Sequence, residues 1–309
     1  MKRLIVTADD FGAAREVNEA VEAAHRGGIL TAASLMVAAP AAADAVALAR
    51  RLHSLRVGLH LVLLEGRPVL PPAAVARLVN GDGQFPSNPA VFGALLARSR
   101  EARRQLAAEV TAQFAAFSDS GLTLDHCNAH KHFHLHPVVG ALITSIGPRF
   151  GLRAVRVPLE PAAVLRRVER RGFSPSAALT VPFAMGLRRR LAAAGLVSPD
   201  FVFGLRWSGQ MTRTRLAALI QHLPEGVSEI YLHPATGSYR GAAPGYRYRE
   251  ELEALMAPEV IAAGRDSSLC IGGFGDFAHL GAQPACSVAA HGGEGSGARR
   301  PGASRSVSA

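Results

Sequence analysis

Apolar runs that end in acidic or histidine residues alternate with amphipathic segments along this chain, and this alternation restricts its fold more than any other feature. Helix-like segments cover, for example, residues 14–28, 41–52 and 101–117. About seven strand-like runs lie between such segments: "RLIVTADD", "AASLMVA", "RVGLHLVL", "LTLDHCNAH", "RAVRVP", "EIYLHP" and "SLCIGGF". This order is typical of a parallel sheet whose strands are joined by helices. The sequence therefore predicts an α/β fold with a closed or nearly closed, barrel-like parallel sheet surrounded by helices.

The length and apolar content predict one large domain rather than several modules. A chain of 309 residues with 49% apolar residues can bury a sizeable core. The alternation spans residues 1–280, which we expect to form a single domain. Residues 281–309 are rich in Gly, Ser and Ala and have no apolar period, so they predict a disordered tail.

Cysteine usage and the apolar runs predict a cytoplasmic protein. The three cysteines are an odd number without CxxC spacing, which does not suit a disulfide framework: Cys127, Cys270 and Cys286. The basic N-terminus reaches acidic residues too soon to form a signal-peptide core. The longest uncharged run, residues 27–43, is shorter than the ~20 residues of a membrane span and contains a proline.

The positive charge of the chain is concentrated in one segment. Residues 165–191 carry seven arginines and one glutamate, a local charge of +6 in a formal total of +10. No zinc-finger, RNP or helix-turn-helix pattern accompanies this segment, and aromatic residues make up only 6% of the chain, so nucleic acid is a poor candidate partner. Arginine-rich genome composition explains part of the excess. An anionic membrane surface suits this arginine-flanked apolar segment better.

Four predicted strands end in residues that can bind metal or transfer protons. The first ends in the adjacent acids of "TADDFG", and later ones end in His60, in the histidine run from His126, and in His233. Reactive groups of parallel β/α folds lie at the carboxyl ends of the strands. We therefore expect these side chains to gather at one edge of the sheet.

Each of these residues also has a structural interpretation. Adjacent acids such as Asp9 and Asp10 can form a solvated turn that caps a helix, and Gly12 would allow a tight turn there. His60 lies between two leucines and could be a hydrogen-bonded core histidine. Neighbouring strand residues point to opposite sides, so one carboxylate would bind metal while the other takes a proton.

The stretch "NAHKHFHLHP" has histidines at alternating positions, which lie on one side of an extended chain: His130, His132, His134 and His136. They cannot all bind one ion. Pro137 suits the first position of a helix, so the run is a strand end followed by a short loop. The later histidines would contact substrate, orient other groups or be exposed. One carboxylate and two imidazoles would leave positions open for water and substrate, as catalysis requires.

The motifs "TADDFG", "GLHL", "NAHKHFHLHP", "VRVP" and "YLHPA" occur in the order and spacing of a known family. Over roughly residues 1 to 280 the chain resembles the YdjC-like carbohydrate deacetylases. Its arginine-rich centre is similar to the hopanoid-biosynthesis-associated members. The resemblance implies a β/α-barrel-type fold, a divalent metal ion and removal of acetyl groups from N-acetylated sugars.

Carried onto this sequence, the resemblance implies that Asp10, His60 and His130 bind one divalent ion. It further implies that Asp9 is the general base and His233 the general acid. Arg156 of "VRVP" would bind substrate or form a structural ion pair, and His134 is a candidate substrate contact. Imidazole ligands suit Zn²⁺, whereas a carboxylate with several waters suits Mg²⁺.

Asn128 and Ala129 stand where relatives often carry an acidic or hydroxyl residue. The surroundings of the metal site are therefore not predicted. The roles of His126, His132 and His136 and the oligomeric state also stay open.

The predicted activity is metal-dependent removal of acetyl from an N-acetylated amino sugar, with an N-acetylglucosaminyl hopanoid lipid as the expected substrate. The segment 165–191 would then rest on an anionic membrane at its inner face. Three alternatives remain: a deacetylase of soluble N-acetylated oligosaccharides, a metal-dependent phosphoesterase and a non-catalytic metal-binding protein. A two-metal phosphoesterase usually needs more bridging carboxylates than this sequence offers.

Overall fold

A computed structural model describes residues 1–170 and 175–278 of the chain. The tail predicted over 281–309 lies outside these residues, as does Cys286. Cys127 is a buried free thiol. Within the described residues, none of the helices combines the length and apolarity needed to cross a bilayer.

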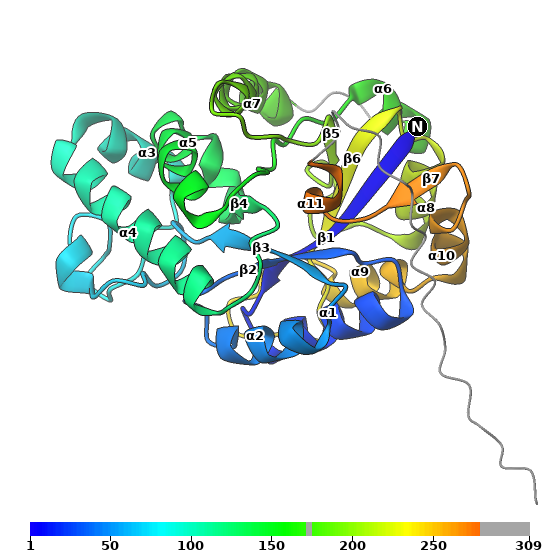
Figure 1. Cartoon of the computed structure of the whole chain (residues 1–309), viewed down its shortest axis with the longest axis horizontal. Coiled ribbons are helices and arrows are strands. Elements are labelled where there is room, and N and C mark those ends of the chain that lie inside the picture. Colours follow the sequence, from blue (N-terminus) through cyan, green and yellow to red (C-terminus); the bar gives the residue numbers. More distant parts are fainter. Residues whose placement is uncertain (171–174, 279–309) are drawn as a thin grey trace, which may run out of the picture.

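Parallel strands form one sheet at the centre of the molecule (Figure 1). The described part of the chain contributes seven strands: β1 (Lys2–Phe11), β2 (Ala32–Leu35), β3 (Arg56–Leu61), β4 (Cys127–Ala129), β5 (Phe201–Phe203), β6 (Gly226–Leu232) and β7 (Leu269–Ile271). Their order is β4-β3-β2-β1-β6-β5, and β7 pairs with the beginning of β1. β1 is buried almost throughout because α1 packs on it and α11 covers Ile5 on the inside of the sheet, which suits its apolar residues Leu4, Ile5 and Val6.

The irregular segment 153–159 connects the two edges of this sheet. On one edge, Cys127 N donates to Ala154 O (3.0 Å) and Arg156 N donates to Cys127 O (3.1 Å). On the other, Val202 N donates to Leu159 O (3.0 Å). The sheet is therefore curled and nearly closed, and the predicted barrel-like α/β fold is confirmed.

Helices surround the curled sheet (Figure 1). The α-helices are α1 (Arg15–Gly27), α2 (Ala42–Arg51), α3 (Pro89–Arg98), α4 (Arg100–Asp119), α5 (Pro137–Ile146), α6 (Ala162–Val168), α7 (Pro175–Ala193), α8 (Arg213–Gln221), α9 (Tyr248–Leu255), α10 (Pro258–Gly264) and α11 (Phe274–Phe277). The 3₁₀ helices are η1 (Pro72–Val75), η2 (His130–Leu135) and η3 (Gly147–Phe150). Their apolar faces pack with the strands into one large core.

The short helix α11 closes the sheet at the end opposite the strand C-termini. Phe274 and Phe277 pack there with Ile5 of β1, Ala32 of β2 and Ala154. Figure 1 shows α11 inside the curve of the sheet. Apolar side chains of α11 therefore fill this end of the barrel, next to the buried polar residues Asp125 and His126.

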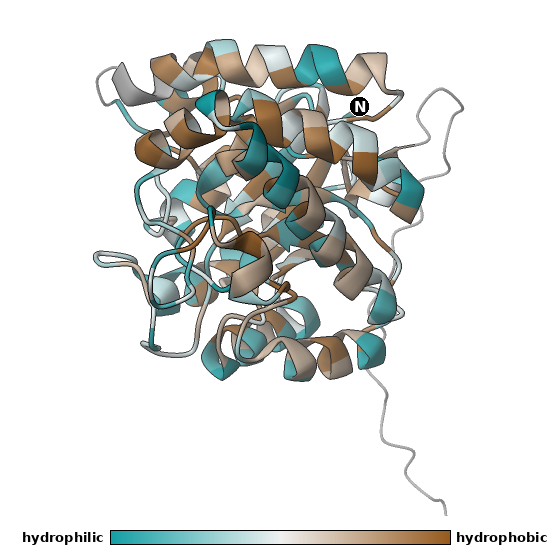
Figure 2. Ribbon diagram, turned by 90° about the vertical axis from the view of Figure 1, so that its left-hand side faces the viewer, coloured by the Kyte–Doolittle hydropathy of each residue, from teal (hydrophilic) through white to brown (hydrophobic). Residues whose placement is uncertain are grey.

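Helix α7 forms part of the outer layer, beside α5 and η2. Figure 2 shows several hydrophobic segments along this helix, at the top of the view. Leu179, Val181, Phe183 and Met185 are exposed, and Leu179 is 73% exposed. The sequence predicted that an apolar stretch lies here between arginine clusters, but it did not predict helices α3, α6 and α8 or strand β5.

Candidate functional site

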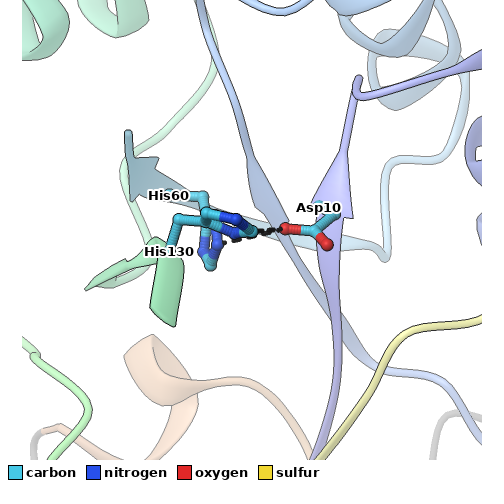
Figure 3. Close-up of side chains that lie close together, drawn as sticks. All are labelled: Asp10, His60 and His130. Atoms are coloured by element: carbon cyan, nitrogen blue, oxygen red, sulfur yellow. Dashed lines mark hydrogen bonds and ion pairs between the residues drawn. The ribbon is translucent and has the colours of Figure 1, made fainter. Parts of the chain in front are cut away.

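Asp10, His60 and His130 come together at the carboxyl ends of three strands. Asp10 lies near the end of β1, His60 near the end of β3, and His130 directly follows β4. The ligand atoms of all three lie within 4.8 Å of one another. Figure 3 shows both imidazoles turned toward the Asp10 carboxylate. The three predicted metal ligands thus form a group that can hold a metal ion.

The backbone of Asp10 is left-handed, with φ 62°. This conformation is costly for a non-glycine residue, by about 1–3 kcal/mol, and is found mostly at functional sites. It interrupts the alternation of the strand, and the β1–β2 register shifts between Ala8 and Phe11. Gly12, with φ 92°, then makes the predicted tight turn.

This turn overturns the expectation that Asp9 and Asp10 point to opposite sides. Asp10 Oδ1 lies 3.3 Å from His60 Nε2, and Asp9 Oδ1 lies 3.9 Å from Nδ1 of the same ring. Alternation fails because Asp10 has no extended conformation. Both carboxylates therefore face the same imidazole.

His60 is held in the orientation and tautomer that a metal ligand needs. The side-chain oxygen of Asn128 lies 2.6 Å from His60 Nδ1, so this nitrogen carries the proton and donates it. Nε2 is then the nitrogen with a free lone pair. It is buried and has no hydrogen-bond partner among the described residues. A buried imidazole lone pair without a partner fits a metal ligand.

The charges around the cluster also fit a divalent cation. Asp9, Asp10 and Glu229 are at most 8% exposed; Asp9 and Glu229 contact the buried guanidinium of Arg156, and Asp10 lies beside His60 and His130. When these three carboxyls are ionised, their negative charge exceeds the positive charge of Arg156 by two. Because buried charge is costly without compensation, a divalent ion at this place would stabilise the cluster.

The pKa values of the ligands reflect the same compact geometry. Burial opposes ionisation of Asp10, but the neighbouring His130 outweighs it and holds the pKa of Asp10 well below its usual value. His130 Nδ1 lies 3.1 Å from Asp10 Oδ1. Burial lowers the pKa of His130, yet the Asp10 charge prevails and raises it overall.

Asp9 and Arg156 form a fully enclosed ion pair inside the barrel. Arg156 is 0% exposed, and it donates to both oxygens of Asp9 and to Glu229 Oε1. Burial alone would raise the pKa of Asp9, but the Arg156 charge holds it far below the usual range. Of the two interpretations left open for Arg156, the geometry is that of the structural ion pair.

His233 lies directly after β6, which pairs with β1 at the same carboxyl edge of the sheet. Burial lowers its pKa, although the charges of Asp10 and Asp9 act in the opposite direction. Its backbone N–H donates to Glu251, and its ring meets Tyr246 edge-on at 5.0 Å between centroids. His233 is therefore near enough to the metal ligands to sense their charge.

The histidine run is not extended, because η2 replaces a straight strand. Lys131 and His132 have φ 53° and 54°, so the predicted one-sided alternation is wrong. The rings diverge instead: His132 Nε2 contacts Tyr231 Oη, His134 Nε2 donates to Arg156 O, and His136 caps α5, which begins at Pro137. In the described part of the chain, the metal cluster includes His130 alone from this run.

His134 was expected to contact substrate, and its environment argues against that role. Its side chain is completely buried, and its Nε2 binds the backbone oxygen of Arg156 at 3.0 Å. Burial lowers the pKa of His134 to about 3, so the ring is neutral at physiological pH. The neutral, buried imidazole of His134 therefore holds the backbone at Arg156 through this hydrogen bond.

Several residues near the site were not predicted. Glu229 and Ser34 are buried polar residues inside apolar strands, a pattern that could have marked them. Glu65 has φ 55°, pairs with Lys131, and its Oε2 lies 4.0 Å from His130 Nε2. The described non-glycine residues with positive φ all lie in or beside the cluster: Asp10, Glu65, Lys131 and His132. No sequence signal marks left-handed backbone at these residue types.

Curated proteins similar to this chain share the name carbohydrate deacetylase. The protein of Geobacillus stearothermophilus is 31% identical over 262 residues, which is 84% of this chain and 91% of that protein. The Mus musculus protein is 34% identical over 254 residues, covering 75% of this chain and 77% of its own length. The Homo sapiens protein is 34% identical over 253 residues, with 75% and 74% covered.

A solved structure has the same fold. It is the crystal structure of an Enterococcus faecalis protein named for cellobiose-phosphate cleavage, with a TM-score of 0.69 and 23% identity, covering 88% of this chain and 97% of that one. The family model described as YdjC-like protein matches residues 3–265, which include every residue of the metal cluster. The chain therefore belongs to the YdjC-like protein family.

Proposed function

We propose that this carbohydrate deacetylase, a hydrolase, removes the acetyl group from an N-acetylated amino sugar with the help of one divalent cation. The observation that carries the proposal is the cluster of Asp10, His60 and His130, with the unpartnered Nε2 of His60 turned toward Asp10. The names of the similar proteins supply the substrate class. Residues 1–280 would form the one catalytic domain.

Asp9 is the general base of the proposed reaction. A divalent ion held by the cluster would polarise the acetamide carbonyl and lower the pKa of a water molecule. Asp9 accepts a proton from the attacking water as the new C–O bond forms. Arg156 keeps Asp9 ionised and fixes its position, since two hydrogen bonds join them.

His233 is the general acid. The amide nitrogen leaves only when protonated, because an amide anion is too basic to depart. Burial makes a protonated His233 a stronger acid, which suits proton transfer to the departing nitrogen. The C–N bond then breaks to give acetate and a free amino sugar. In this proposal Arg156 and His134 position Asp9 and do not bind substrate.

The metal is Zn²⁺ or Mg²⁺. Two imidazoles in the ligand group favour Zn²⁺, and one carboxylate with room for water is compatible with Mg²⁺. Titration of metal-free protein with each ion, followed by activity and by the number of ions bound, distinguishes the two.

The finer proposal is that the amino sugar is part of a membrane lipid, an N-acetylglucosaminyl hopanoid. It rests on α7, since the names of the relatives specify a carbohydrate and no lipid. Exposed apolar side chains of α7, among them Leu179 and Phe183, lie close in sequence to the exposed Arg189 and Arg190. Such a helix suits an anionic membrane surface with its apolar residues dipped inward. The enzyme would then be cytoplasmic and peripheral at the inner face of the membrane.

The membrane proposal is tested with Arg189→Ser/Arg190→Ser. Arg188 is left intact, because it donates to Pro199 O and Asp200 O and so supports the fold. Binding to anionic liposomes and deacetylation of a lipid-linked substrate should fall, whereas a water-soluble N-acetylglucosamine analogue should react as before.

The matched control is Arg98→Ser/Arg100→Ser, which removes the same charge from exposed positions on α3 and α4. If both double variants weaken liposome binding and lipid-linked deacetylation equally, the net charge of the protein and not the position of the arginines determines membrane binding. Absence of liposome binding by the parent protein would reject the membrane proposal and favour soluble oligosaccharides.

The reaction class is tested by product analysis. The purified protein is incubated with N-acetylglucosamine conjugates and with phosphosugars, and acetate and inorganic phosphate are measured in the same samples. Acetate without phosphate supports the deacetylase. Phosphate without acetate would identify a phosphoesterase, and neither product, with several ions bound per chain, would identify a metal-binding protein.

A further inference from the structure

A buried chain of hydrogen bonds leads from the metal ligand His60 to the opposite end of the barrel. Asn128 joins His60 to Ser34, since its oxygen faces His60 Nδ1 at 2.6 Å and its Nδ2 donates to Ser34 Oγ at 2.9 Å. Ser34 Oγ lies 3.0 Å from Nε2 of His126, whose Nδ1 lies 3.0 Å from Asp125 Oδ2. Four consecutive hydrogen bonds thus connect His60 to Asp125 through Asn128, Ser34 and His126.

Asp125 anchors this chain to α11. Its carboxylate accepts hydrogen bonds from Phe274 N at 3.1 Å and from Gly275 N at 2.7 Å. The pKa of Asp125 is lowered, because the hydrogen bonds from His126, Gly275 and Phe274 oppose the effect of burial. Helix α11 lies beyond residue 265, where the family match ends.

The direction of every hydrogen bond in the chain is determined by its two acidic ends. Asn128 Nδ2 also donates to Asp9 Oδ1 at 3.1 Å, and a carboxylate can only accept, so the amide oxygen must face His60. At the other end, Asp125 accepts from His126 Nδ1, which leaves His126 Nε2 to accept the Ser34 hydroxyl proton. Ser34 Oγ in turn accepts from Asn128. Each donated hydrogen therefore meets one acceptor, and the two N–H groups of the Asn128 amide meet Asp9 and Ser34.

Glycines in the neighbouring backbone leave room for this chain of hydrogen bonds. A Cβ at Gly58 would lie 2.5 Å from atoms of the His126 ring, and one at Gly275 would lie 2.9 Å from Asp125 Oδ1. The His126 ring stacks on Phe274 with 4.1 Å between centroids. Ser34, His126 and Asn128 are each 0% exposed. Buried polar groups with complete pairing specify one geometry, because any rearrangement leaves a buried group unpaired.

We propose that Ser34, His126 and Asp125 are positioning residues of the metal site. They fix the amide of Asn128, which orients the ring of His60 toward the metal and aligns the carboxylate of Asp9. This inference rests on the proposed metal-dependent function, but it concerns the binding of the ion and can be tested without substrate.

The first test compares Ser34→Ala with Ser228→Ala. Both changes remove a fully buried hydroxyl from a strand of the sheet, but Ser228 Oγ has no hydrogen-bond partner among the described residues. The affinity of metal-free protein for Zn²⁺ is measured by competition with a chelator, and the melting temperature is measured without metal. Ser34→Ala should weaken Zn²⁺ binding by about 10- to 100-fold. Ser228→Ala should bind Zn²⁺ as the parent does.

The second test uses Asp125→Asn, which keeps the side-chain volume but replaces one of the two accepting oxygens with an NH2 donor, so the new amide cannot accept from His126 Nδ1, Phe274 N and Gly275 N together. Zn²⁺ binding should weaken, and the double variant with Ser34→Ala should bind no more weakly than the worse single variant, because both changes break the same chain. The single variant Asp125→Asn also tests the proposal if Ser34→Ala fails to fold.

Unchanged Zn²⁺ affinity in Ser34→Ala and Asp125→Asn would overturn the proposal. So would equal weakening by Ser34→Ala and Ser228→Ala, which would indicate a general effect on stability. If the parent binds Zn²⁺ and the variants weaken it, but no acetate is released, the positioning role stands and the proposed reaction fails.

Discussion

Arg156 holds Asp9 with two hydrogen bonds inside the barrel, from Nη1 to Oδ2 at 2.5 Å and from Nη2 to Oδ1 at 3.0 Å. Asn128 adds a third donor to the same carboxylate. Asp9 therefore stays ionised and cannot rotate, although its low pKa limits its strength as a base. Asp10, one residue later, lies 3.1 Å from His130 Nδ1 and faces Nε2 of His60, whereas Asp9 faces Nδ1 of the same ring. Neighbouring acids thus have different partners, which predicts different roles.

The first prediction separates these roles. Asp9→Asn should keep one bound metal ion but reduce the rate by ~10²- to 10⁴-fold, the usual cost of removing a positioned general base. Asp10→Asn should lose the metal, because it removes a charged ligand. Elemental analysis of both proteins and the rate of acetate release give the answer. Equal metal loss in the two variants would show that the division of roles is wrong.

The second prediction concerns the stability that depends on Arg156. Arg156→Met leaves Asp9 and Glu229 buried without their shared cation, and breaking a buried ion pair typically costs about 3–5 kcal/mol. The free energy of unfolding, measured by urea titration, should fall by about this amount. Arg104→Met is the control, since Arg104 pairs with Glu101 on the exposed surface of α4 and should matter little. If both variants are equally stable, the buried pair has no structural role.

The third prediction concerns the other histidines of the run. His132→Ala and His136→Ala should each retain one metal ion per chain, because His132 contacts Tyr231 and His136 caps α5. His130→Ala should lose the ion. Metal analysis of the three purified variants tests this, and loss of the ion from either of the first two would reassign a ligand.

The fourth prediction is a pH dependence that originates at Glu251. Burial raises the pKa of Glu251 to about 8, although N–H groups of Met211 and His233 donate to it. The unfolded chain has the lower, ordinary pKa, so unfolding releases a proton between that value and pH 8. The contribution of Glu251 to stability is therefore present at low pH and is lost as the pH rises through this range.

In Glu251→Gln the free energy of unfolding should fall less steeply from pH 5 to pH 8 than in the parent. The difference in slope should be at most about 1.4 kcal/mol per pH unit. Glu160, whose pKa burial raises to about 7, contributes in the same direction and remains in the variant. Identical slopes in urea titrations of both proteins would exclude a raised pKa at Glu251.

Local patterns predicted the sheet and the gathering of acidic and histidine residues at one of its edges, whereas the resemblance to the YdjC-like deacetylases implied which three of them bind the metal. Apolar runs ending in Asp10, His60 and His130 are strand ends, and the ends of parallel strands meet at one edge. The same reasoning failed where backbone conformation departs from the pattern. Nothing in "ADDF" or "HKHF" signals left-handed residues at Asp10, Lys131 and His132.

The partners of the cluster could not be predicted because they depend on contacts across the barrel. Ser34 and Asn128 meet across 94 positions of sequence, and Arg156 meets Asp9 across 147. Strand β5 has only three residues and was not predicted. Packing between distant segments decides such features, and one sequence alone does not reveal it.

The central claim is that Asp10, His60 and His130 hold a divalent ion that deacetylation requires. The most direct measurement is release of acetate and free amine from an N-acetylglucosamine conjugate by chelator-treated protein, before and after Zn²⁺ or Mg²⁺ is added. Parent protein should be inactive without metal and should release acetate and amine in equal amounts once about one ion per chain is bound, while Asp10→Asn stays inactive. Full activity of metal-free parent protein, or of Asp10→Asn without a bound ion, would contradict the claim.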